Sequence, residues 1–344
     1  MQNRADLLFA SRVDALDGDV GQVTGAIVDL RQQRLAALLV RTGRPGTDPH
    51  IVPAEHLTAA KDRRVRLALT QKEVNDLPRL KDNQETVTLP DGEERPLVDT
   101  AVYPSTRNLA RVSVANPLAE SPLLLLRGRQ QIQTPDRFRA PVTGLLVAPD
   151  LALTSLVVRV NRVPGREVIV PADEINEVEP TGIYLYLERE ELLECPDYRP
   201  DADIAADIRR ALVDDRVLYV VDLEHVDVTV QDGIVHVTGN ATNPTTRGRI
   251  EHAISSVRGV LGVDDRLVED IDLQAAVARA IAQDERLRGE QVRIGVRHGR
   301  VILTGWLSSP AQCDVVEQVA WDVPGVREVV NDVRVRESEA VAAG

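Results

Sequence analysis

The stretch Val226–Gly239, VDVTVQDGIVHVTG, decides the fold of the C-terminal part of the chain, because it occurs twice. Its second copy is Val292–Gly305, VRIGVRHGRVILTG. In each copy two alternating runs flank a two-residue turn, Asp232-Gly233 or His298-Gly299. Alternation with a period of two around a glycine predicts a β-hairpin with one apolar face. The expected cross-strand pairs are Val228–Val237, Val230–Val235, Ile294–Leu303 and Val296–Val301.

A helix is expected on either side of each hairpin. Apolar residues recur at helical spacing before it, and an N-cap residue followed by proline comes after it, at Asn243-Pro244 and Ser309-Pro310. A short apolar strand closes each unit. Six glycines at turns, strand ends and helix ends are expected to be structural. The helical positions are Ile204, Ile208, Leu212, Leu273, Val277 and Ile281, and the glycines are Gly233, Gly239, Gly259, Gly299, Gly305 and Gly325.

The order helix, hairpin, helix, strand with glycines at these places resembles the BON domain, found in bacterial osmotic-stress and nodulation-associated proteins. The resemblance covers about residues 202–337 and predicts two α+β domains, residues 201–270 and 271–337, with a tail over 338–344. It implies binding to phospholipid or to an envelope polymer.

A second duplication lies in the N-terminal part. Val23-Thr24-Gly25 returns as Val142-Thr143-Gly144, ALLVR at 37–41 as SLVVR at 155–159, and IVPAEHL at 51–57 as IVPADEI at 169–175. Short strands between turns predict a small sheet closed into a barrel. The segments resemble the PRC-barrel family, which includes domains of a photosynthetic reaction-centre subunit and of a ribosome-maturation factor.

The sequence therefore predicts a multidomain protein, with two small all-β PRC-like barrels followed by two small α+β BON-like domains. The barrels are expected over residues 5–80 and 122–197. A proline-rich connector over 81–121, with an extra hairpin, is expected between them.

Composition restricts the classes of partner. The net charge is −13, with −4 in residues 1–200 and −9 in residues 201–344. Such a surface repels nucleic acid and anionic lipid unless a local basic patch overrides it. No signal peptide is seen, and the longest apolar run, Leu123–Leu126, is too short for a membrane span. We expect a cytoplasmic protein that is peripheral at the membrane if it binds lipid.

No catalytic, cofactor-binding or metal site is expected. Cys195 and Cys313 stand far apart, and the glycines at 18, 21 and 25 lead into a strand rather than a helix. The histidines lack the spacing of metal ligands and are all expected at the surface. They are His50, His56, His225, His236, His252 and His298.

Trp306 and Trp321 are the two tryptophans of the chain and are the candidate contact residues. Their equivalents in the first BON-like unit are Asn240 and Ser255, so neither position is expected in a domain core. Exposed aromatics indicate a contact site, either with another domain of the chain or with an external ligand.

Together the two resemblances imply a non-enzymatic binding or scaffold protein of bacterial type. In the first hypothesis the BON-like domains contact lipid or an envelope surface and the barrels contact protein. The alternative is a purely protein–protein or self-association module in a stress response. A third, an RNA or ribosome-associated role, would need a basic, aromatic-lined face. Nucleic acid is therefore not expected as a partner.

Overall fold

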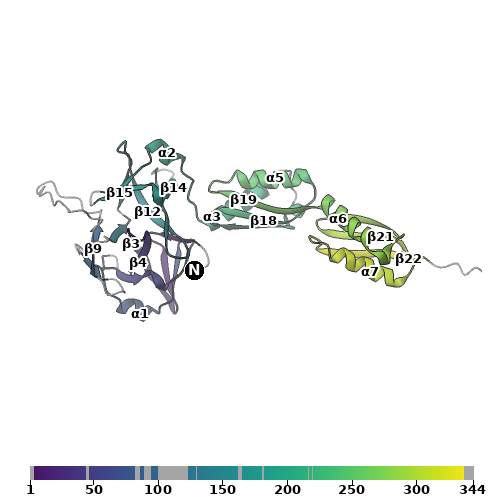
Figure 1. Ribbon diagram of the computed structural model, residues 1–344, viewed down its shortest axis with the longest axis horizontal. Coiled ribbons are helices and arrows are strands. Elements are labelled where there is room, and N and C mark those ends of the chain that lie inside the picture. The colour runs from purple at the N-terminus through teal and green to yellow at the C-terminus, as the bar shows by residue number, and fades with distance from the viewer. Residues whose placement is uncertain are drawn as a thin grey trace, which may run out of the picture. The chain divides into compact units, whose positions relative to one another are not determined.

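The computed structural model describes residues 4–43, 46–81, 86–88, 94–99, 123–128, 130–161, 165–179, 182–215, 217–218 and 220–336. The chain divides into two compact units, Met1–Pro200 and Asp201–Gly344, which are described separately (Figure 1). Among the described residues, no helix is long and apolar enough to cross a membrane.

The N-terminal unit is almost entirely β-structure. Its first half contains β1 (Ala5–Leu8), β2 (Arg12–Ala15), β3 (Gly18–Asp29), β4 (Arg34–Arg41), β5 (His50–Pro53), η1 (Ala54–His56), β6 (Leu57–Lys61), β7 (Arg64–Leu67) and α1 (Gln71–Asp76). The connector contributes the antiparallel pair β8 (Thr86–Thr88) and β9 (Glu94–Asp99). The second half contains β10 (Leu123–Arg127), β11 (Gln131–Gln133), β12 (Arg139–Val147), β13 (Leu153–Arg159), β14 (Glu167–Pro171), η3 (Ala172–Glu174), β15 (Ile175–Glu179), β16 (Gly182–Leu185) and α2 (Arg189–Glu194).

The two repeats of this unit exchange their first strands. β1 pairs with β12 of the second repeat, and β10, its counterpart, pairs with β3 of the first. The repeated Val-Thr-Gly motif explains how the strands fit. A Cβ at Gly25 would lie 2.3 Å from the Leu126 carbonyl oxygen, and one at Gly144 would lie 2.8 Å from that of Leu7. Only glycine leaves room for the incoming strand at both places.

The expectation of two closed barrels is wrong. The strands form a sheet of order β14-β13-β12-β11-β16-β15 with β1 beside β12, and one of order β6-β7-β2-β3-β10-β9-β8 with β4 beside β3 and β5 beside β4. No strand pair closes either sheet within the part of the chain that the structure describes. Because each repeat supplies a strand to the other, one hydrophobic core contains residues of both, such as Leu7, Leu124 and Leu145.

The C-terminal unit repeats one α+β pattern. The first copy contains α3 (Asp201–Asp214), the short α4 (Val220–Leu223), β17 (Val226–Gln231), β18 (Ile234–Ala241), α5 (Pro244–Ser255) and β19 (Gly262–Glu269). The second contains α6 (Asp270–Gln283), η4 (Glu285–Leu287), β20 (Gln291–Arg297), β21 (Arg300–Leu307), α7 (Pro310–Trp321) and β22 (Glu328–Val335). In each sheet the hairpin is antiparallel and the closing strand lies parallel to the second hairpin strand.

The local signals read from the sequence are confirmed here. The hairpin register pairs Val230 with Val235 and Val296 with Val301, as expected. Asn243 caps α5 by accepting a hydrogen bond from the Thr246 amide, and Ser309 forms a capping box with Gln312 at α7. The expected apolar positions of α3 and α6 are all buried. Each copy encloses its own core.

Candidate functional site

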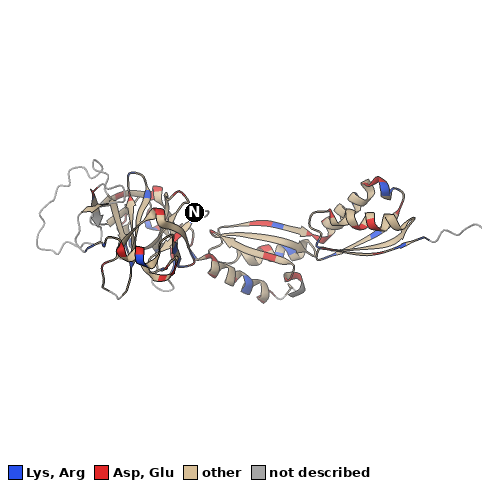
Figure 2. Ribbon diagram, turned by 90° about the horizontal axis from the view of Figure 1, so that it is seen from below, with Lys and Arg blue, Asp and Glu red and all other residues tan. Residues whose placement is uncertain are grey.

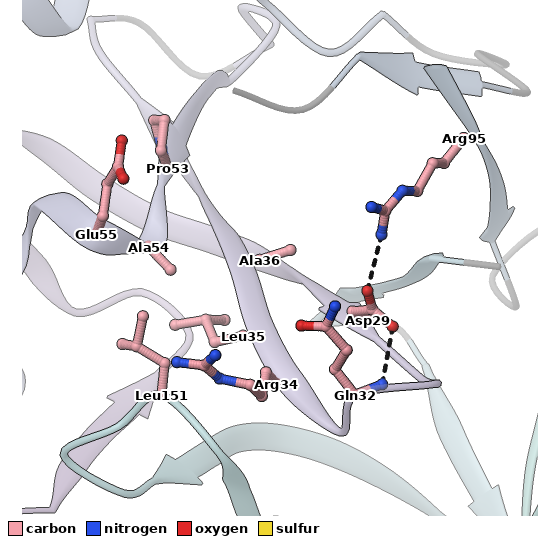
Figure 3. Close-up of a pocket in the computed structure, with 10 residues that line it drawn as sticks. All are labelled: Asp29, Gln32, Arg34, Leu35, Ala36, Pro53, Ala54, Glu55, Arg95 and Leu151. Atoms are coloured by element: carbon pink, nitrogen blue, oxygen red, sulfur yellow. Dashed lines mark hydrogen bonds and ion pairs between the residues drawn. The ribbon is translucent and has the colours of Figure 1, made fainter. Parts of the chain in front are cut away.

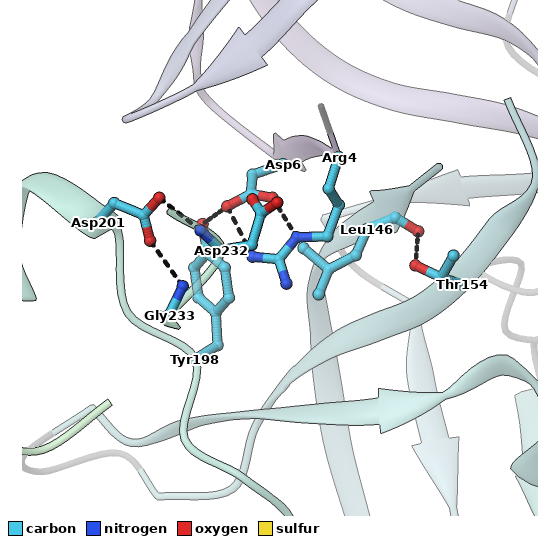
Figure 4. A network of polar contacts seen from close by, with 8 residues as sticks. All are labelled: Arg4, Asp6, Leu146, Thr154, Tyr198, Asp201, Asp232 and Gly233. Carbon is cyan, nitrogen blue, oxygen red and sulfur yellow. Dashed lines mark hydrogen bonds and ion pairs between the residues drawn. The ribbon is translucent and has the colours of Figure 1, made fainter. Parts of the chain in front are cut away.

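Each hairpin turn of the C-terminal unit is held by an aspartate from the helix that precedes it. The Asp201 carboxylate accepts hydrogen bonds from the amides of Asp232 and Gly233, at 2.8 and 3.0 Å (Figure 4). Asp270 does the same for His298 and Gly299, at 2.6 and 2.9 Å. Both carboxylates are buried.

The turn needs such a partner because of its backbone. Both central residues of each turn have positive φ, for example 54° at Asp232 and 78° at Gly233, which points the two amides to the same side. Buried amides without acceptors would cost free energy, so one carboxylate that accepts from both stabilises the turn. This role was not predicted from the sequence, although an aspartate begins the first helix of both copies.

Each three-stranded sheet has one face on its helices and one face open. α7 packs on β21 and β22 in the second copy, and α5 packs on β18 and β19 in the first. In β20 and β21 the residues of the opposite face alternate with buried or half-buried ones and are mostly exposed. The strand register shows which side chains lie on each open face.

The open face of the second copy is basic and partly apolar; we call it the arginine face. Ile302 and Trp306 of β21 lie on it with exposed fractions of 39% and 51%. Arg334 of β22 is paired with Trp306, and its guanidinium lies 5.9 Å from the centre of the indole ring. The residues that define the face are Arg293, Arg297, Arg300, Ile302, Trp306 and Arg334, and Figure 2 marks the charged residues along these strands.

Few acids balance these arginines. Arg300 pairs with Glu328 at 2.8 Å, and both side chains are about half exposed. Asp332 is the other acid of the face, opposite Thr304. Within the described ranges no ion pair forms at Arg293 or Arg297, both of which are exposed. A shallow hollow lined by Thr304, Gly305, Trp306 and residues 331–334 lies beside them.

The same face of the first copy is different. The positions equivalent to Arg293, Arg297 and Arg300 hold Asp227, Gln231 and Ile234. Asp264 accepts a hydrogen bond from His236 at 3.0 Å and forms an ion pair with Arg266 at 2.8 Å. Hydrogen bonds from these two side chains lower the pKa of Asp264, so its charge is retained and matched locally.

The two tryptophans predicted as contact residues do not come together in one pocket. Trp306 is on β21, while Trp321 ends α7 with an exposed fraction of 47%. Asn240, the counterpart of Trp306, is buried, and its Nδ2 donates to the Gly325 carbonyl of the second copy at 3.2 Å. The position equivalent to Trp306 is thus covered by a neighbouring domain in the first copy.

The four arginines of the arginine face were not predicted as contact residues from the sequence. Arg293 and Arg297 alternate with Val292, Ile294 and Val296, so the period of two already placed them on the face opposite the apolar one. The net charge of −13 hid this local excess of basic side chains.

In the N-terminal unit, the buried Tyr198 hydroxyl donates to Asp6 at 3.1 Å, and Arg4 pairs with the same carboxylate at 2.9 Å (Figure 4). Burial, reinforced by the Asp6 charge, raises the pKa of Tyr198 far above its usual value, which keeps this hydroxyl protonated. The contact joins β1 to the C-terminal end of the N-terminal unit.

A hollow of about 340 Å³ in the same unit is lined by Asp29, Arg34, Glu55 and Arg95 among others (Figure 3). Arg95 pairs with Asp29 at 2.8 Å, and Arg34 donates to the Asp150 carbonyl. The basic groups of the hollow are thus engaged by the protein itself.

The expectation that every histidine lies at the surface is wrong for two of them. His50 is buried, with Nδ1 at 2.9 Å from the Leu77 carbonyl oxygen. His298 is buried because the second copy packs its turn against the first copy. Across the described ranges, no group of three or more His, Cys, Asp or Glu side chains could hold a metal ion.

The helix–hairpin–helix–strand units define the class of the C-terminal part as small two-layer α+β modules. The model of the BON domain matches residues 200–270 and 269–337. The C-terminal unit therefore consists of two tandem BON domains, while the PRC-barrel resemblance of the N-terminal unit stays a prediction.

Two solved structures of CdsD, a structural protein of the type III secretion system of Chlamydia trachomatis, are also similar. Its C-terminal domain has 15% identity and a TM-score of 0.33, and the match covers 40% of this chain and 68% of that one. The other structure has 13% identity and a TM-score of 0.20, and the match covers 39% and 92%. At these TM-scores the likeness carries no argument. No curated protein matches the chain.

Proposed function

We propose that this protein is a non-enzymatic binding and scaffold protein that associates with the cell envelope, and that the arginine face of its second BON domain contacts an anionic lipid surface. The observation that carries the proposal is the row of exposed arginines beside Trp306 on an open sheet face. Its N-terminal unit, by the PRC-barrel resemblance, is the part that contacts protein.

The chemistry of the face supports this choice of ligand. A basic side chain close to an anionic membrane contributes about 1 kcal/mol, and an indole ring is stable at the boundary between water and lipid. Arginine also binds phosphate oxygens through two parallel N–H donors. The face thus offers charge, hydrogen-bond donors and apolar area together, against a net charge of −13 for the whole chain.

Flotation with liposomes tests the proposal. Neutralising Arg293 and Arg297 (Arg293→Ala with Arg297→Ala) is expected to weaken binding to anionic vesicles at least tenfold, because each removes about 1 kcal/mol of attraction. Arg279→Ala with Arg288→Ala is the matched control, because these exposed arginines of the same domain lie outside the sheet. Equal losses in both variants would show a response to net charge alone and would contradict the proposal.

A second candidate function is protein assembly through the end of the second BON sheet. The observation that favours it is Asn240, which occupies the place of Trp306 in the first domain and is buried against the second. Trp306, which is half exposed, would then contact a domain of another molecule. Sedimentation of the wild type and of Trp306→Ala tests it, with association in the first protein alone as the supporting result.

A further inference from the structure

A row of basic side chains crosses the outer face of the first repeat in the N-terminal unit; we call it the basic row. The strand register places its members opposite one another on five neighbouring strands, β6, β7, β2, β3 and β4. In that order they are Lys61, Arg64, Arg12, Gln22 and Arg41. Residues that lie opposite each other in a sheet share a face, so these side chains form one line across the strands.

The centre of the basic row is open to solvent. Along β2 and β7 its members alternate with Val13 and Val65, whose side chains are fully buried. Arg12 and Arg64 are exposed, and the side chain of Arg64 has an exposed fraction of 60%. The two arginines therefore project away from the hydrophobic core, where a ligand can reach them.

Few acids balance the row. Asp14 of β2 pairs with Arg64 at 3.4 Å, and Asp19 of β3 lies opposite Asp14. Arg66, the next outward residue of β7, also lies opposite Asp14 and is exposed. Within the described ranges no ion pair forms at Arg12 or Arg66. The face therefore keeps an excess of positive charge, although residues 1–200 as a whole are acidic.

Folding does not explain these charges. Like charges directly opposite each other destabilise a sheet, and Arg64 lies between Lys61 and Arg12. The second repeat pairs the equivalent strands β11 and β16 in the same way, with Gln131 and Gly182 at the places of Arg12 and Arg64. The same architecture thus forms without the basic row, and binding is the better reason for its presence.

We propose that the basic row binds an extended acidic segment of a partner protein, which crosses the strands with carboxylates at alternate positions. Adjacent strands are about 4.8 Å apart, so a row over five strands is about 19 Å long. Alternate side chains of an extended segment are about 6.7 Å apart, so four carboxylates span a similar length. Arginine binds a carboxylate through two parallel N–H donors. The inference rests on the protein contact proposed for the N-terminal unit and gives it a surface and a partner chemistry.

An acidic protein segment fits this face better than a nucleic acid or a membrane does. The outward residues beside the row, such as Ala59 and Asp14, are small or acidic. Among its described residues the face has no aromatic ring on which a base could stack. It also has no counterpart of Trp306 and Ile302, the exposed apolar side chains that favour lipid at the arginine face.

Fluorescence anisotropy of a labelled peptide in which glutamate alternates with serine tests the proposal on the full chain. The chain carries Arg293→Ala and Arg297→Ala throughout, so that the arginine face does not compete for the peptide. Adding Arg12→Gln with Arg64→Gln is expected to weaken binding about tenfold, because each exposed ion pair contributes a factor of about three. The same peptide with glutamine in place of glutamate is expected not to bind.

Arg137→Gln with Arg139→Gln is the matched control, because it removes the same charge from exposed positions of the second repeat and should leave binding unchanged. The Tm of Arg12→Gln with Arg64→Gln should not fall, since opposed like charges are removed. No binding of the acidic peptide, an equal loss in the control, a loss accompanied by a lower Tm, or tighter binding of a uridine oligonucleotide would each overturn the proposal.

Flotation with anionic vesicles separates this proposal from the lipid contact. With the arginine face intact, Arg12→Gln with Arg64→Gln is expected to float like the wild type. Reduced flotation of this variant would place lipid on the basic row and overturn the proposal. A wild-type chain that binds the acidic peptide but does not float would contradict the lipid contact alone.

Discussion

The two BON domains share one framework and differ on the surfaces that the framework leaves uncovered. Both hold their hairpin turn with a buried aspartate, and both begin their second helix at a capped proline. The open face of the first carries Asp227 and Asp264, whereas that of the second carries a row of arginines beside Trp306. Duplication therefore kept what folds the domain and changed what it can contact.

A single pair of positions shows the same division. Asn240 and Trp306 occupy equivalent places near the ends of β18 and β21. The small amide fits against Gly299 and bonds to the second domain, while the indole has no domain against it among the described residues. One position thus serves docking within the chain in the first domain and is available for contact in the second.

The largest expected effect concerns the shared framework. Asp270→Ala leaves two buried amides without an acceptor and is expected to lower the free energy of unfolding of the second domain by about 3 kcal/mol. Asp201→Ala should do the same to the first domain. Urea unfolding followed by tryptophan fluorescence reports the second domain, which holds both tryptophans. Asp272→Ala, which changes an exposed aspartate two positions further along α6, is the control. A loss as large in this variant would contradict a specific role for Asp270.

A smaller effect is expected at the interface between the two BON domains. Asn240→Trp gives the first domain the residue of the second and cannot fit against Gly299, so docking should weaken by about 2 kcal/mol. Thr238→Trp, on the same face of the same strand but exposed, should leave docking unchanged. Energy transfer between dyes on the exposed Ser255→Cys and Ser308→Cys, one in each domain, measures docking in both variants. An Asn240→Trp protein that stays docked would contradict close packing of Asn240 against Gly299.

The smallest expected effect separates the two tryptophans. Trp306→Ala should weaken binding to lipid by about 1 kcal/mol, since part of the indole is buried on contact. Trp321→Ala, which removes an exposed aromatic at the end of α7, should change binding by less than about twofold. Flotation with vesicles of constant composition compares them, and a larger loss at Trp321 would place the contact on the helical side instead.

Much of the C-terminal unit could be predicted from its sequence, since its signals are local. Alternating valines, an Asx-Pro or Ser-Pro cap and a turn glycine each act within a few residues, so their pattern survives without tertiary information. The strand exchange in the N-terminal unit could not be predicted. β1 pairs through Ala5–Leu8 with residues more than 130 positions away, and the alternation of apolar residues in each strand does not identify that partner.

The candidate site, too, could be predicted from the sequence only in part. The outward direction of Trp306 followed from comparing the two copies, and the arginines beside it followed from strand alternation once the register was known. The burial of His298 did not follow, because it results from contact between domains rather than from the hairpin itself.

The most direct test of the account exchanges the two open faces in one flotation assay. Arg293→Asp with Arg297→Gln gives the second domain the residues of the first, and binding to anionic vesicles is expected to fall at least tenfold. Adding Asp227→Arg and Gln231→Arg moves the arginines to the first domain and should restore much of the binding, with its sensitivity to salt. Undiminished binding after the first pair of changes would contradict the claim that the arginine face is the lipid contact.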